Sequence, residues 1–308
     1  MDELLKLSLI DLTAMIQKRK TSPVELMEAV LSRVEETNPD LNTVVAMREQ
    51  EALLADARRS EERVMSGEAQ PLEGIPLGVK DLEDVEGLVT SQGSLPFRSQ
   101  VAEHDSTQVS RLRKAGAIVL GKTNTPEFGH TAITKNLVYG VTRSPWNIER
   151  TPGGSSGGSA AALSGCVLPL VTASDGGGSI RIPASFTGAF GLKPSFGRVP
   201  RGPFMQWSYA GTSVYGPLTK TVEDAALFMD QVVGHSTYDP NSLPHPGISY
   251  LESVRKPLHD ALRIGYSPDL GNAVVQSDIA SAVEDALRDF EKMGHRIERL
   301  EGGPPLIG

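Results

Sequence analysis

Residues 153–182 read GGSSGGSAAALSGCVLPLVTASDGGGSIRI, and the rest of the chain can be interpreted outward from them. Two Gly- and Ser-rich segments, 153–159 and 174–180, flank an Ala-rich run typical of a short helix and an apolar run, 167–172, typical of a strand. Successive backbone N–H groups in such Gly-rich turns form anion-binding nests, which acyl-transfer enzymes need for their oxyanion. Flexible linkers have a similar composition, but a linker has no reason to enclose an apolar strand.

A serine nucleophile requires a nearby base, and the sequence offers few candidates for it. Ser155 and Ser179, one in each Gly-rich segment, are the candidate nucleophiles. No histidine lies in a recognisable catalytic context; the histidines are His104, His130, His235, His245, His259 and His295. Lys80 is an alternative base, because burial can lower the pKa of a lysine until it is neutral. It follows the apolar run 75–79, where the solvated end of a strand is the competing interpretation.

Three motifs together resemble the amidase signature family: GVKD at 78–81, GGSSGGS at 153–159 and SDGGGSIR at 174–181. Three further segments agree with the same family, namely GKTNTPEF at 121–128, YGVTRSPWN at 139–147 and GPL at 216–218. The resemblance covers about residues 8–232. It implies that Ser179 is the nucleophile, that Ser155 is a second serine in a cis peptide bond, and that Lys80 is the base.

The resemblance also implies the roles of neighbouring residues. The backbone N–H groups expected to form the oxyanion hole belong to Gly176, Gly177, Gly178 and Ser179. The residues expected to support this loop, or to cap the helix after the first segment, are Asp175, Arg181 and Ser156. The residues expected to contact the substrate are Gly154, Phe128, Thr131 and Trp207. For the aromatic residues of this set, packing in the core is an equally good interpretation.

Composition and charge narrow the class of protein. The formal net charge of −8 argues against nucleic acid or an anionic membrane surface as a partner. A hydrophobic content of 39% with 31 glycines and 21 prolines is typical of a loop-rich globular enzyme. We find no signal peptide and no apolar run near the roughly 20 residues that span a bilayer. The single cysteine, Cys166, predicts a reducing, cytoplasmic location. The motifs need no metal and no cofactor.

Helices and strands are expected to alternate after an N-terminal helical layer. Helices are predicted at about 9–18, 23–38, 49–65, 107–114, 221–233 and 278–293, and the second should begin with a capping box at 22–25. Strands are predicted at about 75–79, 117–120, 167–172, 262–266 and 296–300. This alternation predicts an α/β fold. The resemblance adds a mixed, mostly parallel central sheet covered by helices on both faces.

One domain is expected to span residues 1–308, with a helical layer at 1–70, a catalytic core at 71–235 and the start of a C-terminal part at 236–308. Family members are usually longer, and this chain stops at Gly308, just after a predicted strand. Either the chain is a truncated form or another copy supplies the missing cover. A sheet that stops there exposes an edge and an apolar face, so we expect a homodimer or low stability.

The expected activity is hydrolysis of a small-molecule carboxamide to a carboxylate and an amine or ammonia, through an acyl-enzyme on Ser179. The glutaminase component of an amidotransferase, which releases ammonia from glutamine, shares the catalytic residues and is one alternative. An α/β-hydrolase-type esterase using Ser155 is a second, but its nucleophile must follow a strand, and residues 147–152 do not read as one. A binding protein that has lost activity is a third.

Overall fold

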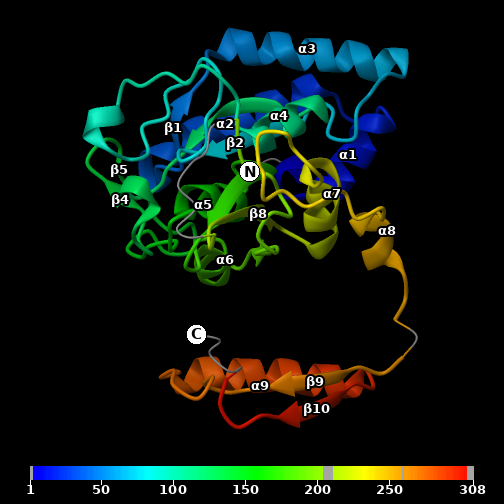
Figure 1. Ribbon diagram of the computed structural model, residues 1–308. Coiled ribbons are helices and arrows are strands. Elements are labelled where there is room, and N and C mark those ends of the chain that lie inside the picture. The colour runs from blue at the N-terminus through cyan, green and yellow to red at the C-terminus, as the bar shows by residue number, and fades with distance from the viewer. Residues whose placement is uncertain (1–2, 204–210, 259, 304–308) are drawn as a thin grey trace. The chain divides into compact units, whose positions relative to one another are not determined.

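The computed structural model describes residues 3–203, 211–258 and 260–303. The chain forms two compact units, Met1–Arg255 and Lys256–Gly308. The larger unit contains a sheet surrounded by helices, and the smaller one contains two strands and a helix (Figure 1). The sequence-based division of a single domain at residues 70 and 235 stays a prediction.

The larger unit is built on a six-stranded sheet with the order β1-β3-β2-β6-β8-β7. Its strands are β1 (Val44–Met47), β2 (Pro76–Lys80), β3 (Ile118–Thr123), β6 (Leu170–Asp175), β7 (Phe190–Gly191) and β8 (Val214–Thr219). The central strand β2 pairs in parallel with β3 and β6, whereas β1, β8 and β7 pair antiparallel with β3, β6 and β8. Four strands, β2, β3, β6 and β7, therefore run in one direction, which confirms the predicted mixed, mostly parallel sheet.

The central strands are buried along their whole length. Every residue of β2, β3, β6 and β8 is buried, and apolar side chains such as Val79, Val119 and Val171 belong to the core. Lysines are buried near the carboxyl ends of β2 and β3, at Lys80 and Lys122. Because a buried charge is costly unless other groups compensate it, these positions indicate where the fold departs from simple packing.

Helices surround this sheet (Figure 1). They are α1 (Leu9–Gln17), α2 (Pro23–Leu41), α3 (Gln50–Ser66), α4 (Thr107–Lys114), α5 (Gly157–Ser164), α6 (Arg181–Thr187), α7 (Val222–Val232) and α8 (Tyr250–Arg255). The short helix α5 contacts β2, β3, β6 and β8, so it lies across one face of the sheet. A small separate sheet of β4 (Lys135–Asn136) and β5 (Gly140–Val141) precedes α5 in the chain.

Polar side chains begin several of these helices, as the sequence predicts. The Ser22 hydroxyl accepts a hydrogen bond from the Glu25 N–H at 3.1 Å, and the Glu25 carboxylate accepts one from the Ser22 N–H at 2.9 Å. Pro23 occupies the first turn, where it sacrifices no intrahelical hydrogen bond. Thr221 and Asp224 form the same reciprocal box at the start of α7. The predicted capping box of α2 is thus confirmed.

The end of α2 differs from the prediction. The sequence predicts a stop near Pro39, but the helix continues to Leu41 and ends at Asn42, which has a left-handed φ of 51°. A proline inside a helix removes one intrahelical hydrogen bond. Here the Asn38 side chain holds the following turn instead, because its Oδ1 accepts the Thr43 N–H at 2.8 Å.

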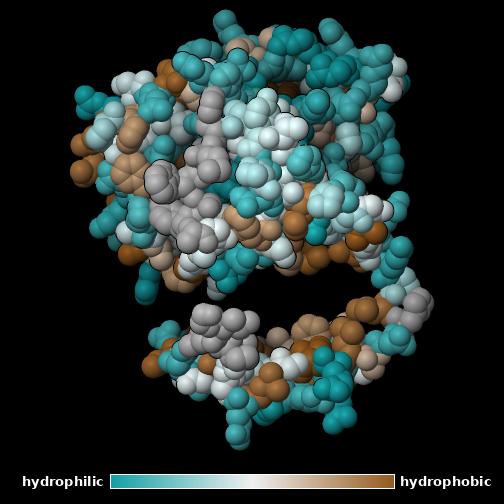
Figure 2. Space-filling view, viewed as in Figure 1, coloured by the Kyte–Doolittle hydropathy of each residue, from teal (hydrophilic) through white to brown (hydrophobic). Residues whose placement is uncertain are grey.

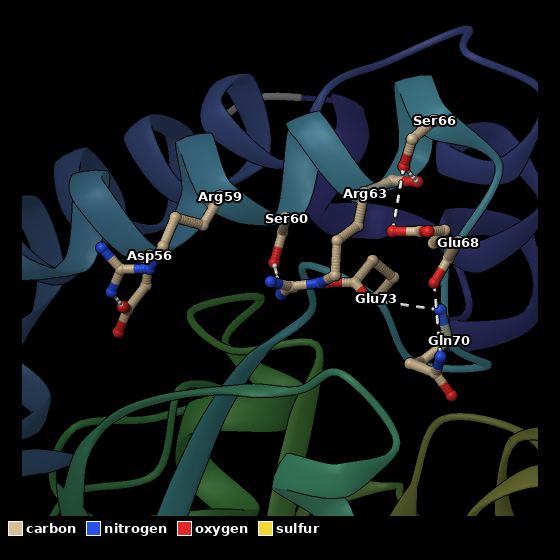
Figure 3. Close-up of polar contacts among 8 residues, drawn as sticks. All are labelled: Asp56, Arg59, Ser60, Arg63, Ser66, Glu68, Gln70 and Glu73. Atoms are coloured by element: carbon tan, nitrogen blue, oxygen red, sulfur yellow. Dashed lines mark hydrogen bonds and ion pairs between the residues drawn. The ribbon is translucent and has the colours of Figure 1, made fainter.

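Charged side chains fix the connection between α3 and β2 (Figure 3). Arg63 donates to the Glu73 carboxylate from Nη2 at 2.7 Å and from Nε at 3.1 Å, and Glu73 also accepts the Gln70 N–H at 3.1 Å. The Glu73 side chain is only 1% exposed, so these bonds compensate for the water it has lost. A side chain at Gly116 would meet the Glu73 backbone at 2.7 Å, which explains the glycine there.

The outer helix α3 is amphipathic. Leu53, Ala57 and Val64 are buried against the protein, and the side chains over α3 on the face shown in Figure 2 are mainly hydrophilic. Within the described ranges, no helix is both long enough and apolar enough to cross a membrane.

The smaller unit contains β9 (Arg263–Tyr266), α9 (Ser277–Lys292) and β10 (Arg296–Arg299). The two strands are parallel, with Arg296 opposite Arg263. A parallel pair requires a crossover connection, and α9 provides it. The predicted order of strand, helix and strand is confirmed here.

Candidate active site

Adjacent parallel strands bring the predicted catalytic residues to one edge of the sheet. Lys80 is the last residue of β2, and Asp175 is the last residue of the neighbouring strand β6. Ser155 lies two residues before α5, the helix that contacts both strands. In open α/β sheets, ligands bind outside the carboxyl ends of the strands, and this is such an edge. The fold therefore brings together segments that are about a hundred residues apart in sequence.

Hydroxyl groups surround the Lys80 amine. Its Nζ lies 2.8 Å from Ser155 Oγ, 2.8 Å from Ser156 Oγ and 3.0 Å from Ser174 Oγ, and Lys80 itself is fully buried. In the described part of the chain no carboxylate forms an ion pair with it. The lysine is thus solvated by neutral oxygens, and the interpretation as an exposed strand end is wrong.

Burial is the main cause that lowers the pKa of Lys80, to about 7, and the positive charge of Arg201 acts in the same direction. Glu83 and Asp175 act in the opposite direction, but their effect is smaller than that of burial. A substantial fraction of this amine is therefore neutral near neutral pH, as a proton acceptor must be.

The peptide bond between Gly154 and Ser155 is cis, as the resemblance implies. The Ser155 carbonyl accepts a hydrogen bond from the Thr125 hydroxyl at 3.1 Å. A Cβ at Gly154 would lie 3.0 Å from backbone atoms of Thr131 and Ala132, so a larger residue would displace that neighbouring segment. The backbone thus packs tightly around Ser155.

The Ser156 side chain does not cap α5, which corrects the prediction. Ser156 occupies the N-cap position, but its hydroxyl contacts Lys80 and donates to the Ser174 carbonyl at 3.3 Å. The helix start is held in another way, because the Gly158 N–H donates to the Asn124 carbonyl at 3.1 Å.

Asp175 organises the second Gly-rich loop. Its carboxylate accepts the Gly178 N–H at 2.8 Å and the Ile180 N–H at 3.1 Å, and it pairs with the Arg181 guanidinium at 2.9 Å. Burial alone would raise the pKa of Asp175, but these hydrogen bonds outweigh it and lower the pKa to about 2. The placement agrees with the supporting roles expected for Asp175 and Arg181.

The same bonds correct one member of the expected oxyanion hole. The Gly178 N–H is donated to Asp175 and is not available to a substrate oxygen. Gly178 also has a φ of 117°, which glycine adopts without strain. The remaining candidates are the N–H groups of Gly176, Gly177 and Ser179, whose residues border the cavity described next.

A cavity of about 430 Å³ contains both candidate nucleophiles. It is lined by Leu82, Phe128, Gly129, His130, Thr131, Ala132, Gly154, Ser155, Ser174, Gly176, Gly177, Ser179, Ile182 and Ser213. Three of the expected substrate contacts, Gly154, Phe128 and Thr131, are among these residues. The fourth, Trp207, lies outside the described residues. No group of His, Cys, Asp or Glu side chains in the described ranges could hold a metal ion.

The sequence interpretation did not identify three residues around Lys80. Ser174 immediately precedes Asp175 in the second motif and could have been found from strand alternation, because it shares a face of β6 with Thr172, whose hydroxyl accepts the Lys80 N–H at 3.0 Å. Glu83 and Arg201 reach the site from loops, and no pattern in the sequence indicates that they do.

Comparisons with known proteins agree with this arrangement. The family model described as Amidase matches residues 25–305. An acylamidase of Rhodococcus erythropolis is 38% identical over 295 residues, and the A-type chain of a glutamyl-tRNA(Gln) amidotransferase of Syntrophobacter fumaroxidans is 39% identical over 291 residues; each alignment covers 94% of this chain. These alignments cover 61% and 59% of the two relatives, so the chain spans about three fifths of their length.

Solved structures show the same fold. A bacterial aryl acylamidase of the amidase signature family superposes with a TM-score of 0.87 at 30% identity, covering 96% of this chain and 61% of that one. The peptide amidase from Stenotrophomonas maltophilia gives a TM-score of 0.83 at 28% identity, covering 96% of this chain and 62% of that one.

Proposed function

Because the chain belongs to the amidase signature family, we propose that it hydrolyses a small-molecule carboxamide through an acyl-enzyme on Ser179. One observation carries the proposal. A buried lysine, surrounded by hydroxyl groups and without a carboxylate partner among the described residues, contacts Ser155 in a cavity that also contains Ser179. Such a lysine can accept a proton that an exposed, charged lysine cannot.

The reaction would begin with two proton transfers. The hydroxyl of Ser179 gives its proton to Ser155, and Ser155 gives its own to the Lys80 amine. The Ser179 oxygen then attacks the carbonyl carbon of the amide, and the oxyanion that forms is stabilised by the N–H groups of Gly176, Gly177 and Ser179. The protonated relay returns a proton to the leaving nitrogen, the C–N bond breaks, and water subsequently hydrolyses the acyl-enzyme.

The cavity favours an uncharged acyl group. Among its described lining residues, His130 is the only one with an ionisable side chain at neutral pH. Residues 204–210, FMQWSYA, also lack a charged side chain. Glutamine carries an ammonium and a carboxylate, each of which needs an opposite charge when it is removed from water. These features favour an amidase over the ammonia-releasing component of an amidotransferase.

The esterase alternative does not fit the surroundings of Ser155. Residues 147–152 form turns and an isolated bridge, so no strand leads into the GGSSG segment as the nucleophile of an α/β-hydrolase requires. We place the enzyme in the cytoplasm on the basis of its single, half-buried cysteine, Cys166. The homodimer stays a prediction that light scattering can test.

Labelling and substrate assays test the proposal together. A fluorophosphonate should modify Ser179 in the wild-type protein and leave Ser179→Ala unmodified, with the modified residue identified by mass spectrometry. A panel of aryl amides, aliphatic amides, esters and glutamine should give products mainly from the uncharged amides. Modification of Ser155 would favour the esterase, and hydrolysis of glutamine alone would favour the amidotransferase.

A further inference from the structure

Three hydroxyl oxygens lie around the Lys80 amine, and hydrogen-bond accounting assigns a different role to each. A neutral lysine amine has two N–H donors and one lone pair, whereas the ammonium form has three donors and no lone pair. For Lys80 to accept a proton from Ser155, its lone pair must face Ser155 Oγ at 2.8 Å. Both N–H groups must then find acceptors elsewhere, because an unpaired buried donor is costly.

Ser156 is one of these acceptors. Its hydroxyl donates its own hydrogen to the Ser174 carbonyl at 3.3 Å, so its oxygen faces Lys80 as an acceptor at 2.8 Å. This leaves one N–H of the neutral amine without an assigned acceptor.

Ser174 Oγ, 3.0 Å from Lys80 Nζ, is the remaining oxygen. Ser174 also borders the cavity, where its hydroxyl hydrogen can be donated to water or substrate. We propose that Ser174 is a positioning residue, whose hydroxyl accepts the second N–H of Lys80 and thereby directs the lone pair of the amine at Ser155. The inference rests on the proposed function.

The same oxygens also suit the product of the proton transfer. Once the Ser155 proton has moved to Lys80, the ammonium has three N–H groups, and Ser155, Ser156 and Ser174 provide one acceptor for each. Loss of the Ser174 hydroxyl should therefore have two effects. The neutral amine can rotate its lone pair away from Ser155, which slows the transfer, and the ammonium loses an acceptor, which disfavours the charged form.

Charged groups near Lys80 would not account for such a change. Glu83 follows β2, Asp175 ends β6 and Arg201 precedes β8, and their charges act on the pKa of Lys80. A substitution at Ser174 leaves all three in place. A shift in the pH profile would accordingly report the lost hydroxyl.

The test compares Ser174→Ala, Ser174→Cys and Ser174→Thr with the matched control Ser159→Ala. Ser159 is another buried serine, but it bonds Thr123 and the Thr172 carbonyl and has no hydrogen bond to Lys80. The rate at which a fluorophosphonate acylates Ser179 is measured from pH 5 to pH 10, together with thermal unfolding of each variant.

We expect Ser174→Ala to lower the plateau rate on the order of tenfold, the usual effect of one lost hydrogen bond at a reacting group. Its inflection should also move to lower pH than in the wild type. Ser174→Cys, which keeps the shape but offers only a weak acceptor, should behave in the same way. Ser174→Thr should restore both the rate and the inflection, and Ser159→Ala should leave both unchanged.

A plateau and inflection like those of the wild type in Ser174→Ala and Ser174→Cys would overturn the inference. So would a lower plateau with an unmoved inflection, because that result indicates a structural role only. If Ser174→Ala does not fold, Ser174→Cys and Ser174→Thr decide the question. Absence of Ser179 acylation in the wild-type protein would instead contradict the proposed function itself.

Discussion

Two lysines are fully buried in neighbouring strands, and their surroundings differ. In the register of β2 and β3, Lys122 lies opposite Val79 and Lys80 lies opposite Thr123, so the two side chains point to opposite faces of the sheet. Lys122 Nζ lies 3.4 Å from the Asp81 carboxylate and 3.0 Å from the Thr90 hydroxyl. The amine of Lys80 is instead surrounded by serine hydroxyls.

The comparison shows that burial alone does not make a base. Burial lowers the pKa of both lysines, but the Asp81 charge in contact with Lys122 opposes this effect. Lys80 has no such contact in the described structure, so burial dominates and the pKa falls to about 7. One lysine therefore serves as a buried ion-pair partner, and the other is available to take a proton.

Removal of each lysine should have opposite consequences for activity. We expect Lys80→Met to lower the rate of Ser179 acylation by a factor on the order of 10³ or more, because residues of a catalytic relay act as a unit. Folded Lys122→Met should retain most of the rate. Fluorophosphonate labelling with mass spectrometry measures both variants. Equal losses in the two would show that the surroundings do not distinguish the lysines.

The paired lysine should matter more for stability. Lys122→Met leaves the Asp81 carboxylate buried without its partner, which should lower the free energy of unfolding by about 3–5 kcal/mol. Adding Asp81→Asn should recover part of this loss, because the amide carries no charge. Urea unfolding provides the measurement, and an undiminished free energy of unfolding in the single variant would argue against a charged pair.

The unpaired lysine should make stability depend on pH. The pKa of Lys80 is about 7 in the folded protein, below the ordinary value of 10.5, so stability is lost as pH falls between these values. Lys80→Met escapes this loss. Its free energy of unfolding, relative to the wild type, should rise by about 1.4 kcal/mol per pH unit from about pH 9 to about pH 7, and then level off. Parallel urea titrations would contradict this if the difference stayed constant.

A smaller effect should come from Arg201, whose positive charge lowers the pKa of Lys80. We expect Arg201→Gln to move the acidic limb of the acylation profile to higher pH. The Arg201 guanidinium also donates to the Ser213 carbonyl at 3.2 Å, so thermal unfolding should accompany the assay. A shift to lower pH in a folded variant would contradict the assigned direction.

Local patterns predicted the elements that depend on local chemistry. Caps such as Ser22 with Glu25, and apolar runs such as the one before Lys80, specify helices and strands from a few neighbouring residues. Strand β8 was not predicted, because Gly216 and Pro217 read as a turn. In the fold, a Cβ at Gly216 would lie 2.5 Å from the Leu192 carbonyl, so the packing of a distant segment explains the glycine.

The site shows the same limit. The motifs indicated which loops meet, and the structure places Lys80 against Ser155 and places Ser179 in the same cavity. They did not indicate that the Gly178 N–H turns towards Asp175. Nor did they indicate that a hydroxyl 94 residues from Lys80 contacts its amine, because such a contact depends on the register of β2 and β6.

The most direct measurement is the titration of the two lysines within one protein. Lysine labelled with ¹³C at Cε, assigned with Lys80→Met and Lys122→Met, reports the charge of each amine by NMR as pH is raised. We expect Lys80 to titrate near pH 7 and Lys122, in contact with Asp81, to titrate at higher pH. A Lys80 signal that remains that of an ammonium above pH 9, or two lysines that titrate together, would contradict the account.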